Sequence, residues 1–418
     1  MILVLIMLIG LLLLILYTYF RKYSLRQILH MCGQGIFTTR GILRLFIMLG
    51  ILTALWRASG TIPLLVNYSL HLIHPEAFLL IAFLLNGAMS LLTGTALGTA
   101  ATIGVICASA GHALGISPCW TGGAILAGAY FGNRLSPISS MALLTANLTQ
   151  TDIYKNVHRM LRTTWLPLLL SCGIYLTVGF SGIFQSDSGN FSAADWQSLF
   201  ARECSLSLWS VLPAVLMLAL SIFKVRSSRV LLLSACAAIP VAFFAEGHSW
   251  SSLLKMLVFG YTSSVPELSK MMNGGGLVSM KNVFCIVLIA GCFGGIFKGT
   301  GMLSPLQGFI FKISQKSNSF FAKLLTSIFV ACITCNQTLT IILTHQLSEN
   351  IPSQDPALDL YDSAVIVIAL VPWSVATAMI LSLAGTPSSS VLCACFLYLL
   401  PLSHLVHFGW RAQGHSKL

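Results

Sequence analysis

The chain has 418 residues, of which 56% are hydrophobic and only 8% are charged, and its mean hydropathy is +0.87. A soluble domain carries about 25% charged residues, so this composition excludes a soluble enzyme, a disordered protein and a secreted disulfide scaffold. The 23 basic and 11 acidic residues give a net charge of +12. We attribute this charge to basic loops that fix membrane orientation and not to nucleic-acid binding. The composition predicts an all-α polytopic membrane protein.

Apolar stretches follow one another along the chain. Residues 1–20 lack a basic start and a cleavage site, so we predict a first transmembrane helix and not a signal peptide. Residues 77–133 and 363–410 contain no charged side chain, and each stretch is long enough for two crossings. Gly, Pro, Ser and Thr interrupt both, so some helices are expected to be broken or re-entrant. Together with clean spans at 163–182, 205–223 and 230–245, the pattern predicts about ten to twelve membrane segments.

Charged residues gather in separate loops. Basic residues cluster at 21–44, 155–162, 224–229 and 312–323. Cytoplasmic loops of membrane proteins collect Lys and Arg, so we assign these four groups to the cytoplasm. The N-terminus, the 184–204 loop and the acidic loop at 349–359 are then expected outside, and beyond residue 362 the count is ambiguous by one crossing.

Three short segments recur in the same order at a nearly fixed offset. Residues 90–95 echo 331–336, residues 135–139 echo 370–374, and the segment around Arg57 echoes the segment around Lys298. A basic loop precedes the first copy and follows the second, which predicts two inverted repeats of the kind found in secondary transporters. The predicted organisation is an N-terminal helix at 1–20, a first repeat at 40–183, a connecting loop and helices at 184–281, a second repeat at 282–408 and a polar tail at 409–418.

Two polar runs interrupt the apolar segments of the first repeat. Residues 93–104 carry a hydroxyl or a glycine at most positions, and their counterpart is 334–338. Small residues also serve close helix packing, but for the cluster as a whole we predict a lined cavity. In residues 128–140, Pro137 frees a backbone carbonyl and the Ser and Asn side chains offer oxygen ligands. Arg134 in that run either pairs with an anionic substrate or marks a helix end.

Asp362 lies at the edge of the last uncharged stretch. An ionisable residue at a membrane segment is a functional hypothesis, and the alternative is an interfacial carboxylate of the acidic outer loop. His112 and His345 could carry protons near neutral pH, or could be hydrogen-bonded packing histidines. No phosphate-binding loop, catalytic triad or metal-ligand spacing is found in the sequence. We therefore expect no catalytic residues, no metal and no cofactor, and transport driven by a gradient.

Several motifs resemble those of the NhaC-type Na⁺/H⁺ antiporters. The longest is the run from Gly123 to Ser139, and the likeness extends in consistent order over roughly residues 40–405. The resemblance implies a multi-pass transporter of a bacterial inner membrane, with two inverted repeats and hairpin-like broken helices. The matching segments are 58–63, 98–104, 123–139, 151–153, 158–164, 274–280 and 371–373.

The chain departs from that family at its acidic positions. The family has an acidic residue where this chain has Asn133, Ser140, Asn336 and Tyr361, and it has Asn at the position of Ser374. Only Asp362 is kept. Neutral side chains can ligate Na⁺ through oxygen but cannot exchange it for a proton, so Asp362 would have to do so alone or with a histidine.

These observations predict a secondary antiporter that exchanges Na⁺ or a related solute for H⁺. The alternatives are a proton- or sodium-coupled transporter of a small organic acid or amine, a passive channel, and a non-transporting relative. The expected partners are the lipid bilayer and a small ion or solute, with no nucleic acid, and a homodimer is left open. Asp362, His345 and His112 are the candidates for proton coupling. The predicted ion- or substrate-binding residues are Asp362, Asn133, Ser136, Ser139, Ser140, Asn336, Gln337, Ser374, Thr95 and Thr99.

Overall fold

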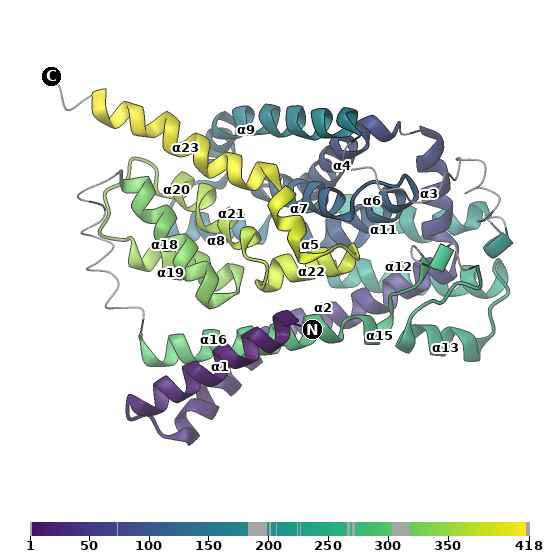
Figure 1. The fold of residues 1–418 in the computed structure, drawn as a ribbon, viewed down its shortest axis with the longest axis horizontal. Coiled ribbons are helices and arrows are strands. Elements are labelled where there is room, and N and C mark those ends of the chain that lie inside the picture. Colours follow the sequence, from purple (N-terminus) through teal and green to yellow (C-terminus); the bar gives the residue numbers. More distant parts are fainter. Residues whose placement is uncertain are drawn as a thin grey trace.

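The regular elements of the protein are helices (Figure 1). The computed structural model describes residues 2–72, 74–182, 199, 202–205, 207–223, 225, 227–265, 268–269, 272–302, 314 and 318–414. Within these ranges there is no strand, and Tyr261 and Gly274 form one isolated antiparallel bridge. The all-α prediction is confirmed. Most of the 184–204 loop and the end of the polar tail fall outside the described residues.

Many of the helices are apolar enough for a membrane protein. Among the described residues, three helices meet both the length and the hydropathy of a span, namely Pro75–Thr93, Ala96–Ala113 and Ile153–Ser181. Two bent pairs of helices raise this number to five if each pair is one span, and seven further apolar helices have 10–17 residues. Broken and short helices are therefore abundant, as expected for a polytopic protein, and the total of ten to twelve crossings stays a prediction.

Three long helices lie along one side of the molecule, α1 (Ile2–Phe20), α2 (Leu25–Ala58) and α16 (Lys281–Thr300) (Figure 1). Ser24 starts α2 with a capping box, because its hydroxyl accepts from the backbone N–H of Gln27. Helices α2 and α16 cross at glycines: a Cβ added at Gly35 would lie 1.9 Å from the carbonyl oxygen of Gly291. Only a residue without a side chain permits this approach.

The first broken segment is a helical hairpin. Helix α4 (Phe78–Thr93) ends at Gly94, and the chain returns through α5 (Ala96–Thr99), the wide turn η2 (Ala100–Gly104) and α6 (Val105–Ala113). The two outer ends meet, because a Cβ added at Gly111 would lie 3.0 Å from the ring of Phe78. The polar run predicted at 93–104 therefore forms the tip and the first turns of the returning arm.

The second broken segment is also a hairpin. Helix α18 (Ser319–Thr334) ends at Cys335, and α19 (Gln337–Leu347) returns beside it (Figure 1). Ala322 near the start of α18 shares one apolar cluster with Leu347 and Ile351, which follow at the end of α19. Both ends of this hairpin therefore lie on the same side of its tip.

Two further segments cross the molecule as broken helices. Helix α7 (Pro118–Leu135) is interrupted at residues 136–139 before α8 (Ser140–Thr149). The other crossing runs through α20 (Pro356–Asp362), α21 (Ala364–Val367) and η4 (Ile368–Leu370), then breaks at 371–374 before α22 (Val375–Leu383), with a bend of 56°. Both breaks predicted from proline and serine are confirmed.

Helix α9 (Ile153–Ser181) relates the two hairpins (Figure 1). Its late residue Gly179 touches the backbone of Glu76, just before the first hairpin. Its early residue Arg159 forms a 2.8 Å ion pair with Asp355, just after the second hairpin. The hairpins therefore enter from opposite ends of α9. Inverted repeats would produce this arrangement, and the repeats themselves stay a prediction.

The acidic loop at 349–359 is not on the side predicted from charge. Asp355 pairs with Arg159, and Asp359 pairs with Lys323 at 2.8 Å, so the loop lies beside two of the basic groups assigned to the cytoplasm. The second hairpin returns the chain to the side from which it entered, and acidic residues carry little weight in setting orientation. The prediction of an acidic outer loop is therefore wrong if the basic groups are cytoplasmic.

The remaining helices cover these segments. Helix α23 runs from beside η5 across α9 and α20 towards the C-terminus (Figure 1). The other elements of the described chain are α3 (Thr61–Leu72), η1 (Pro75–Ala77), η3 (Leu208–Val211), α11 (Leu212–Ile222), α12 (Ser227–Phe244), α13 (Trp250–Phe259), α15 (Gly276–Ser279), η5 (Ser388–Cys393) and α23 (Cys395–Gly414).

Candidate functional site

A cavity of about 220 Å³ lies where the hairpin tips and the broken crossings meet. Four of the predicted binding residues line it, namely Thr95, Asn133, Ser140 and Gln337. They come from both halves of the sequence and from the breaks that sequence analysis singled out. The rest of the lining is formed by Leu45, Leu49, Gly94, Ala96, Leu97, Gly98, Tyr130, Met141, Leu231, Ala376 and Met379. We refer to it as the central cavity.

The two hairpin tips have the same backbone path. Gly94 and Cys335 both adopt the left-handed conformation, with φ of 67° and 53°. In each tip the next residue, Thr95 or Asn336, is extended, with φ of −140° and −130°. The recurring sequence thus gives a recurring turn, which ends one helix and starts the next at the cavity.

A threonine stabilises each tip in the same way. Thr99 donates to the carbonyl of Thr95 at 3.0 Å, and its counterpart Thr340 donates to the carbonyl of Asn336 at 2.9 Å. Thr99 is fully buried and does not line the central cavity. Its position therefore indicates a role in holding the tip, and binding by Thr99 stays a prediction.

The two crossing breaks also share one geometry. Ser136 and Val371 are extended, and the backbone N–H three residues later donates back to each carbonyl, at 3.1 and 3.0 Å. Ser139 caps α8 and Ser374 caps α22 through their hydroxyls. Serine at the last position of each break therefore starts the following helix.

In both halves the tip contacts the crossing break. A Cβ added at Gly94 would lie 2.7 Å from the side chain of Ile138. In the second half the backbone N–H of Val375 donates to the carbonyl of Cys335 at 2.9 Å. These contacts enclose the central cavity between two similar pairs of interruptions.

None of the described lining residues of the central cavity is charged. Four helices begin at it, α5, α8, α19 and α22, and the start of each carries a partial positive charge. Helices α4 and α7 end at it, near Gly94 and Asn133, and these ends carry the opposite partial charge. The start of α5 has no side-chain cap, and its first residues Ala96, Leu97 and Gly98 all line the cavity.

A buried charge cluster lies next to this cavity. Asp362 is fully buried and forms an ion pair with Arg134, while Nδ1 of His404 lies 2.7 Å from its other oxygen. Arg134 directly follows the cavity residue Asn133 at the end of α7. Val365, three residues after Asp362, accepts a 3.2 Å hydrogen bond from the amide of Gln337. The buried charges are therefore linked to the cavity in two ways, through Asn133, which precedes Arg134, and through Gln337, which is hydrogen-bonded to Val365.

His404 connects Asp362 to a second acid. Its Nε2 lies 3.5 Å from Asp359, which binds Lys323 at 2.8 Å and accepts from Ser353 at 2.6 Å. The ring of Phe320 stacks on His404 with centroids 3.8 Å apart. Two acids, two bases and one histidine thus form a continuous buried network, which we call the charge cluster.

The charge cluster reaches a larger cavity at the basic end of α9. This cavity has a volume of about 620 Å³, and His404 forms part of its wall together with Arg159 and Arg162. Thr163 lines it as well and accepts from Arg134 at 2.9 Å. A proton could therefore pass between this cavity and Asp362 through a single side chain.

Not all predicted residues meet at one place. Ser139 reaches the central cavity indirectly, by donating to Asn133 at 2.8 Å. Ser136 is fully buried and its hydroxyl has no partner, while Asn336 and Ser374 act as helix caps. The two predicted histidines are elsewhere: His112 lines a separate cavity, and His345 lies half-buried in the last turn of α19.

Sequence reasoning missed His404, Asp359 and Lys323 as members of the site. Asp359 and Lys323 were read as loop charges, although both are buried. His404 stands in an apolar stretch with no local motif. The one available signal is spacing, because Asp359 and Asp362 are three residues apart and so share a helix face.

The comparisons with known proteins agree with this architecture. The sequence profile described as "Na⁺/H⁺ antiporter family" matches residues 1–146 and 128–410. The chain is 29% identical to the Na⁺/H⁺ antiporter NhaC of Alkalihalophilus pseudofirmus, over 90% of this chain and 84% of the relative.

Two further relatives differ in the solutes that their names give. The chain is 27% identical to an uncharacterized Na⁺/H⁺ antiporter of Haemophilus influenzae, over 94% of this chain and 87% of the relative. It is 28% identical to the malate-2H⁺/Na⁺-lactate antiporter of Bacillus subtilis, over 78% of this chain and 70% of the relative. These relatives are named as antiporters and not as enzymes. The chain belongs to the Na⁺/H⁺ antiporter family.

Proposed function

We propose that the protein is a secondary antiporter of the bacterial cytoplasmic membrane that exchanges a small organic carboxylate and couples this exchange to protons. One observation carries the choice of substrate. The central cavity contains the uncapped start of α5, and no acidic side chain is among its described lining residues. Free backbone N–H groups at a helix start bind anions.

A bare cation would be poorly compensated in this cavity. Moving an ion out of water is costly unless a counter-charge or many strong ligands replace the water. Thr95, Asn133, Ser140 and Gln337 offer neutral oxygens, but the nearby acid Asp362 is already paired with Arg134. A carboxylate would find helix starts and hydrogen-bond donors instead.

The size of the central cavity suits an organic solute. One water needs roughly 10–15 Å³ of such space, and the cavity offers about 220 Å³. Apolar residues such as Leu45, Leu49 and Met379 line the remainder. A short carbon chain could therefore pack against them while its carboxylate faces the start of α5.

Asp362 and His404 are proposed to carry the proton. They face one another at 2.7 Å, and Arg134, Asp359, Lys323 and Arg162 are the other charged groups around them. Because His404 also lines the 620 Å³ cavity, it offers a route from the basic side of the protein. The name of the relative from Bacillus subtilis likewise combines an organic anion with protons.

We further infer that alternating access is produced by two inverted repeats around the central cavity. Paired breaks with the same backbone geometry support this, as do hairpins that enter from opposite ends of α9. In such transporters the site lies where discontinuous helices meet near the middle of the membrane.

Exchange of Na⁺ for H⁺ is the second candidate. The names of two relatives favour it, and the neutral oxygens at Thr95, Asn133 and Gln337 could ligate Na⁺. In this case Asp362 would have to leave Arg134 during transport. His112 and His345 are not retained as proton carriers in either candidate, because they lie away from the charge cluster.

Proteoliposomes with an internal pH dye distinguish the two candidates. Under the proposal, lactate or malate gradients drive proton movement and counterflow of labelled carboxylate, and pulses of Na⁺, Li⁺ or K⁺ do not. Proton flux that follows Na⁺ and ignores carboxylates would establish the second candidate. Asp362→Asn should abolish proton movement in both cases, and Asp355→Asn is the matched control because Asp355 pairs with an arginine that is half exposed.

A further inference from the structure

A second polar cavity lies towards the opposite end of the helices that line the central one. Its volume is about 110 Å³. Arg57 at the end of α2, His112 at the end of α6 and Thr121 at the start of α7 contribute to it, and so do Ser109, Asn273 and Thr386. No acidic side chain is among its described lining residues. We call it the Arg57 cavity.

Arg57 is a buried cation without an anionic partner in the described part of the protein. Only 9% of its surface is exposed. One terminal nitrogen donates to the carbonyl of Thr53 at 3.1 Å, but Nε has no hydrogen-bond partner and no ion pair forms with the residue. Burying an isolated charge costs free energy, so the burial of Arg57 is unfavourable unless an anion binds next to its guanidinium group.

Thr121 provides an independent indication. It is 1% exposed, and its hydroxyl also has no hydrogen-bond partner. A Cβ added at Gly111 would lie 2.8 Å from this hydroxyl, so the space around it is tightly bounded. Two buried donors without partners therefore line one cavity, whereas buried polar groups are normally hydrogen-bonded.

A glycine turn brings backbone close to the guanidinium group. Gly274 and Gly275 have φ of 131° and 72°, which L side chains rarely adopt. A Cβ at Gly275 would lie 2.5 Å from the backbone nitrogen of Ala54, and one at Gly274 would lie 3.9 Å from Arg57. The turn packs on α2, and the residue before it, Asn273, lines the Arg57 cavity.

We propose that the Arg57 cavity binds a small monovalent anion, either a halide or a short carboxylate. The guanidinium supplies charge and N–H donors, and the hydroxyl of Thr121 supplies a further donor. The volume of about 110 Å³ admits such an anion but is half that of the central cavity. This site is distinct from the central cavity, since the two share no lining residue.

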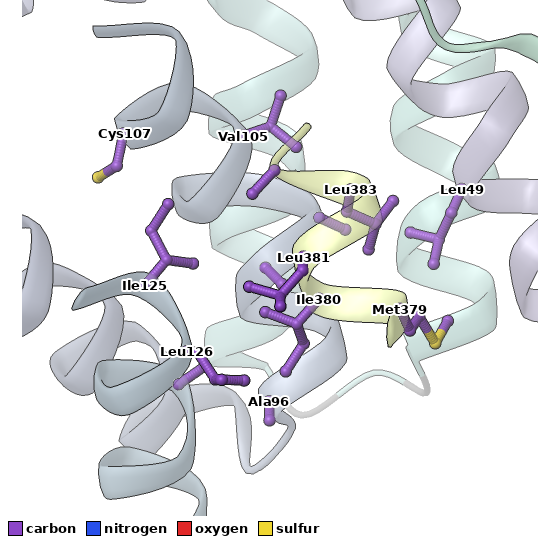
Figure 2. Packing of buried hydrophobic residues seen from close by; sticks show 14 of the residues in the cluster. Leu49, Ala96, Val105, Cys107, Ile125, Leu126, Met379, Ile380, Leu381 and Leu383 are labelled. Atoms are coloured by element: carbon purple, nitrogen blue, oxygen red, sulfur yellow. The ribbon is translucent and has the colours of Figure 1, made fainter. Parts of the chain in front are cut away.

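The two cavities are stacked along the same helices. Leu49 and Met379 line the central cavity, whereas Arg57 and Leu383 line the other, on α2 and α22 respectively. At about 1.5 Å per residue, these positions are about 12 and 6 Å apart. Figure 2 shows the apolar packing between them, with Ala96 at one end, Val105 at the other, and Ile380 and Leu381 in the middle.

Binding is measured on the full chain in detergent, without a gradient, so that its outcome does not depend on transport. The unfolding temperature is recorded while chloride, bromide, acetate or lactate replaces gluconate at constant ionic strength. Equilibrium binding of labelled chloride and labelled acetate is measured in parallel. A saturable rise with a small anion is expected, and the anion that saturates at the lowest concentration identifies the class.

Arg57→Gln should weaken binding of that anion at least about tenfold, and Arg40→Gln, at an exposed arginine of the same helix, should leave it unchanged. A carboxylate in the central cavity would still bind to Arg57→Gln, so the carboxylate binding that survives in this variant is assigned to the central cavity. If Arg57→Gln does not fold, Thr121→Val keeps the shape of the side chain and removes its donor. About tenfold weaker binding is expected for it, the value of one hydrogen bond to a charged group.

The proposal is overturned if no small anion stabilises the wild type more than gluconate does. It is equally overturned if Arg57→Gln, or Thr121→Val where the first variant does not fold, keeps both the affinity and the number of sites of the wild type for chloride and acetate. Failure of carboxylate transport would leave this site standing, because binding is observed without transport.

Discussion

Asp362 and Arg134 illustrate how a buried ion pair constrains its surroundings. Both side chains are fully enclosed, and Arg134 also donates to the hydroxyls of Thr163 and Thr164. Burying two charges is expensive, and their attraction offsets this cost only while both are present. Whatever moves a proton onto Asp362 must therefore also change the partner of Arg134.

Asp362→Asn should destabilise the protein strongly, because it leaves Arg134 buried without a counter-charge. The expected loss is about 3–5 kcal/mol. Asp355→Asn also removes an aspartate from an arginine, but Arg159 is 51% exposed, so a loss of less than about 1 kcal/mol is expected. Unfolding in detergent by denaturant, followed by tryptophan fluorescence, compares the two variants. Equal losses would contradict the assignment of Asp362 to a buried pair.

The double variant Arg134→Met with Asp362→Leu separates stability from coupling. Replacing both members of a buried pair by apolar residues is often neutral for stability, so most of the loss should be recovered. Proton movement in proteoliposomes should nevertheless be absent. Retained proton movement would show that the proton is carried elsewhere.

His404→Gln tests the histidine of the charge cluster. Glutamine can still hydrogen-bond to Asp362 but cannot carry a proton. Substrate binding should therefore persist, while proton-coupled counterflow should become much slower. Asp359, Asp362, Lys323 and Arg162 remain in place as the neighbouring charges. An unchanged rate of proton-coupled counterflow would exclude His404 from the proton route.

At this scale the sequence predicts Asp362 but not its partners. An acid at the edge of an uncharged stretch is visible locally, because charge inside a membrane segment is rare. His404 comes from α23 and Lys323 from α18, and their meeting depends on how distant helices pack. For Arg134 the sequence left two alternatives, an anionic substrate or a helix end. The residue lies in the last turn of α7 and pairs with Asp362, a contact that depends on the packing of distant helices.

At the scale of elements, the two halves repeat a specific construction. Three features recur 241 positions apart: a tip residue in the left-handed conformation at 94 and 335, an extended residue at 95 and 336, and a threonine at 99 and 340 that donates to the carbonyl of the extended residue. These interruptions were predictable because Gly, Pro, Ser and Thr act over a few residues. The sequence did not predict that the arms fold back as hairpins, because this folding depends on packing between Phe78 and Gly111 and around Ala322.

Gly94→Ala should disrupt the first tip. The residue has a positive φ, and the added methyl group would lie 2.7 Å from Ile138. Gly182→Ala is the control, since its φ of 62° carries the same backbone strain but nothing lies within 4 Å of the added group. We expect about 1 kcal/mol of destabilisation from strain in both and a further 1–3 kcal/mol, roughly, at Gly94 from the clash. Unfolding in denaturant measures the difference in stability between the two variants. Equal losses would mean that the added methyl group at position 94 fits beside Ile138 without a clash.

Glu203 ties the connecting segment to the turn after α13. It accepts from the hydroxyl of Tyr261 at 2.8 Å and from the backbone and hydroxyl of Ser264 at 3.1 and 2.9 Å. Burial raises the pKa of Glu203, but these hydrogen bonds outweigh it, so that the folded-state pKa lies below the usual value. The stabilisation is therefore present above the unfolded pKa of about 4.3 and is lost as pH falls through the lower folded pKa.

Glu203→Gln should thus be less stable than the wild type at neutral pH, and the gap should close in acid. The difference in unfolding temperature is expected to be constant above about pH 5 and to shrink below about pH 4. Ser207→Ala, which removes a helix cap nearby without a charge, should show a difference that does not vary with pH. If the difference in unfolding temperature between the wild type and Glu203→Gln widens in acid, the folded-state pKa of Glu203 is raised and not lowered.

At the scale of the whole molecule, the arrangement around α9 decides which loops share a side. That the basic loops share one side stays a prediction, and the pairs of Asp355 with Arg159 and of Asp359 with Lys323 place the acidic loop on that same side and not opposite to it. Local charge could not reveal that α18 and α19 return the chain, and so bring Asp355 to Arg159. The number of crossings was likewise beyond the sequence, because a hairpin and a full span have the same apolar composition.

Protease sites inserted into two loops test this arrangement directly. One is inserted after His74, before the first hairpin, and the other after Asn350, beyond the second; both residues are exposed. Because the hairpins enter from opposite ends of α9, an impermeant protease should cut the first site in right-side-out vesicles and the second in inside-out vesicles. Variants that retain transport show that the insertions are tolerated. Cleavage of both sites from the same face would contradict the opposed hairpins, and with them the inverted repeats on which alternating access depends.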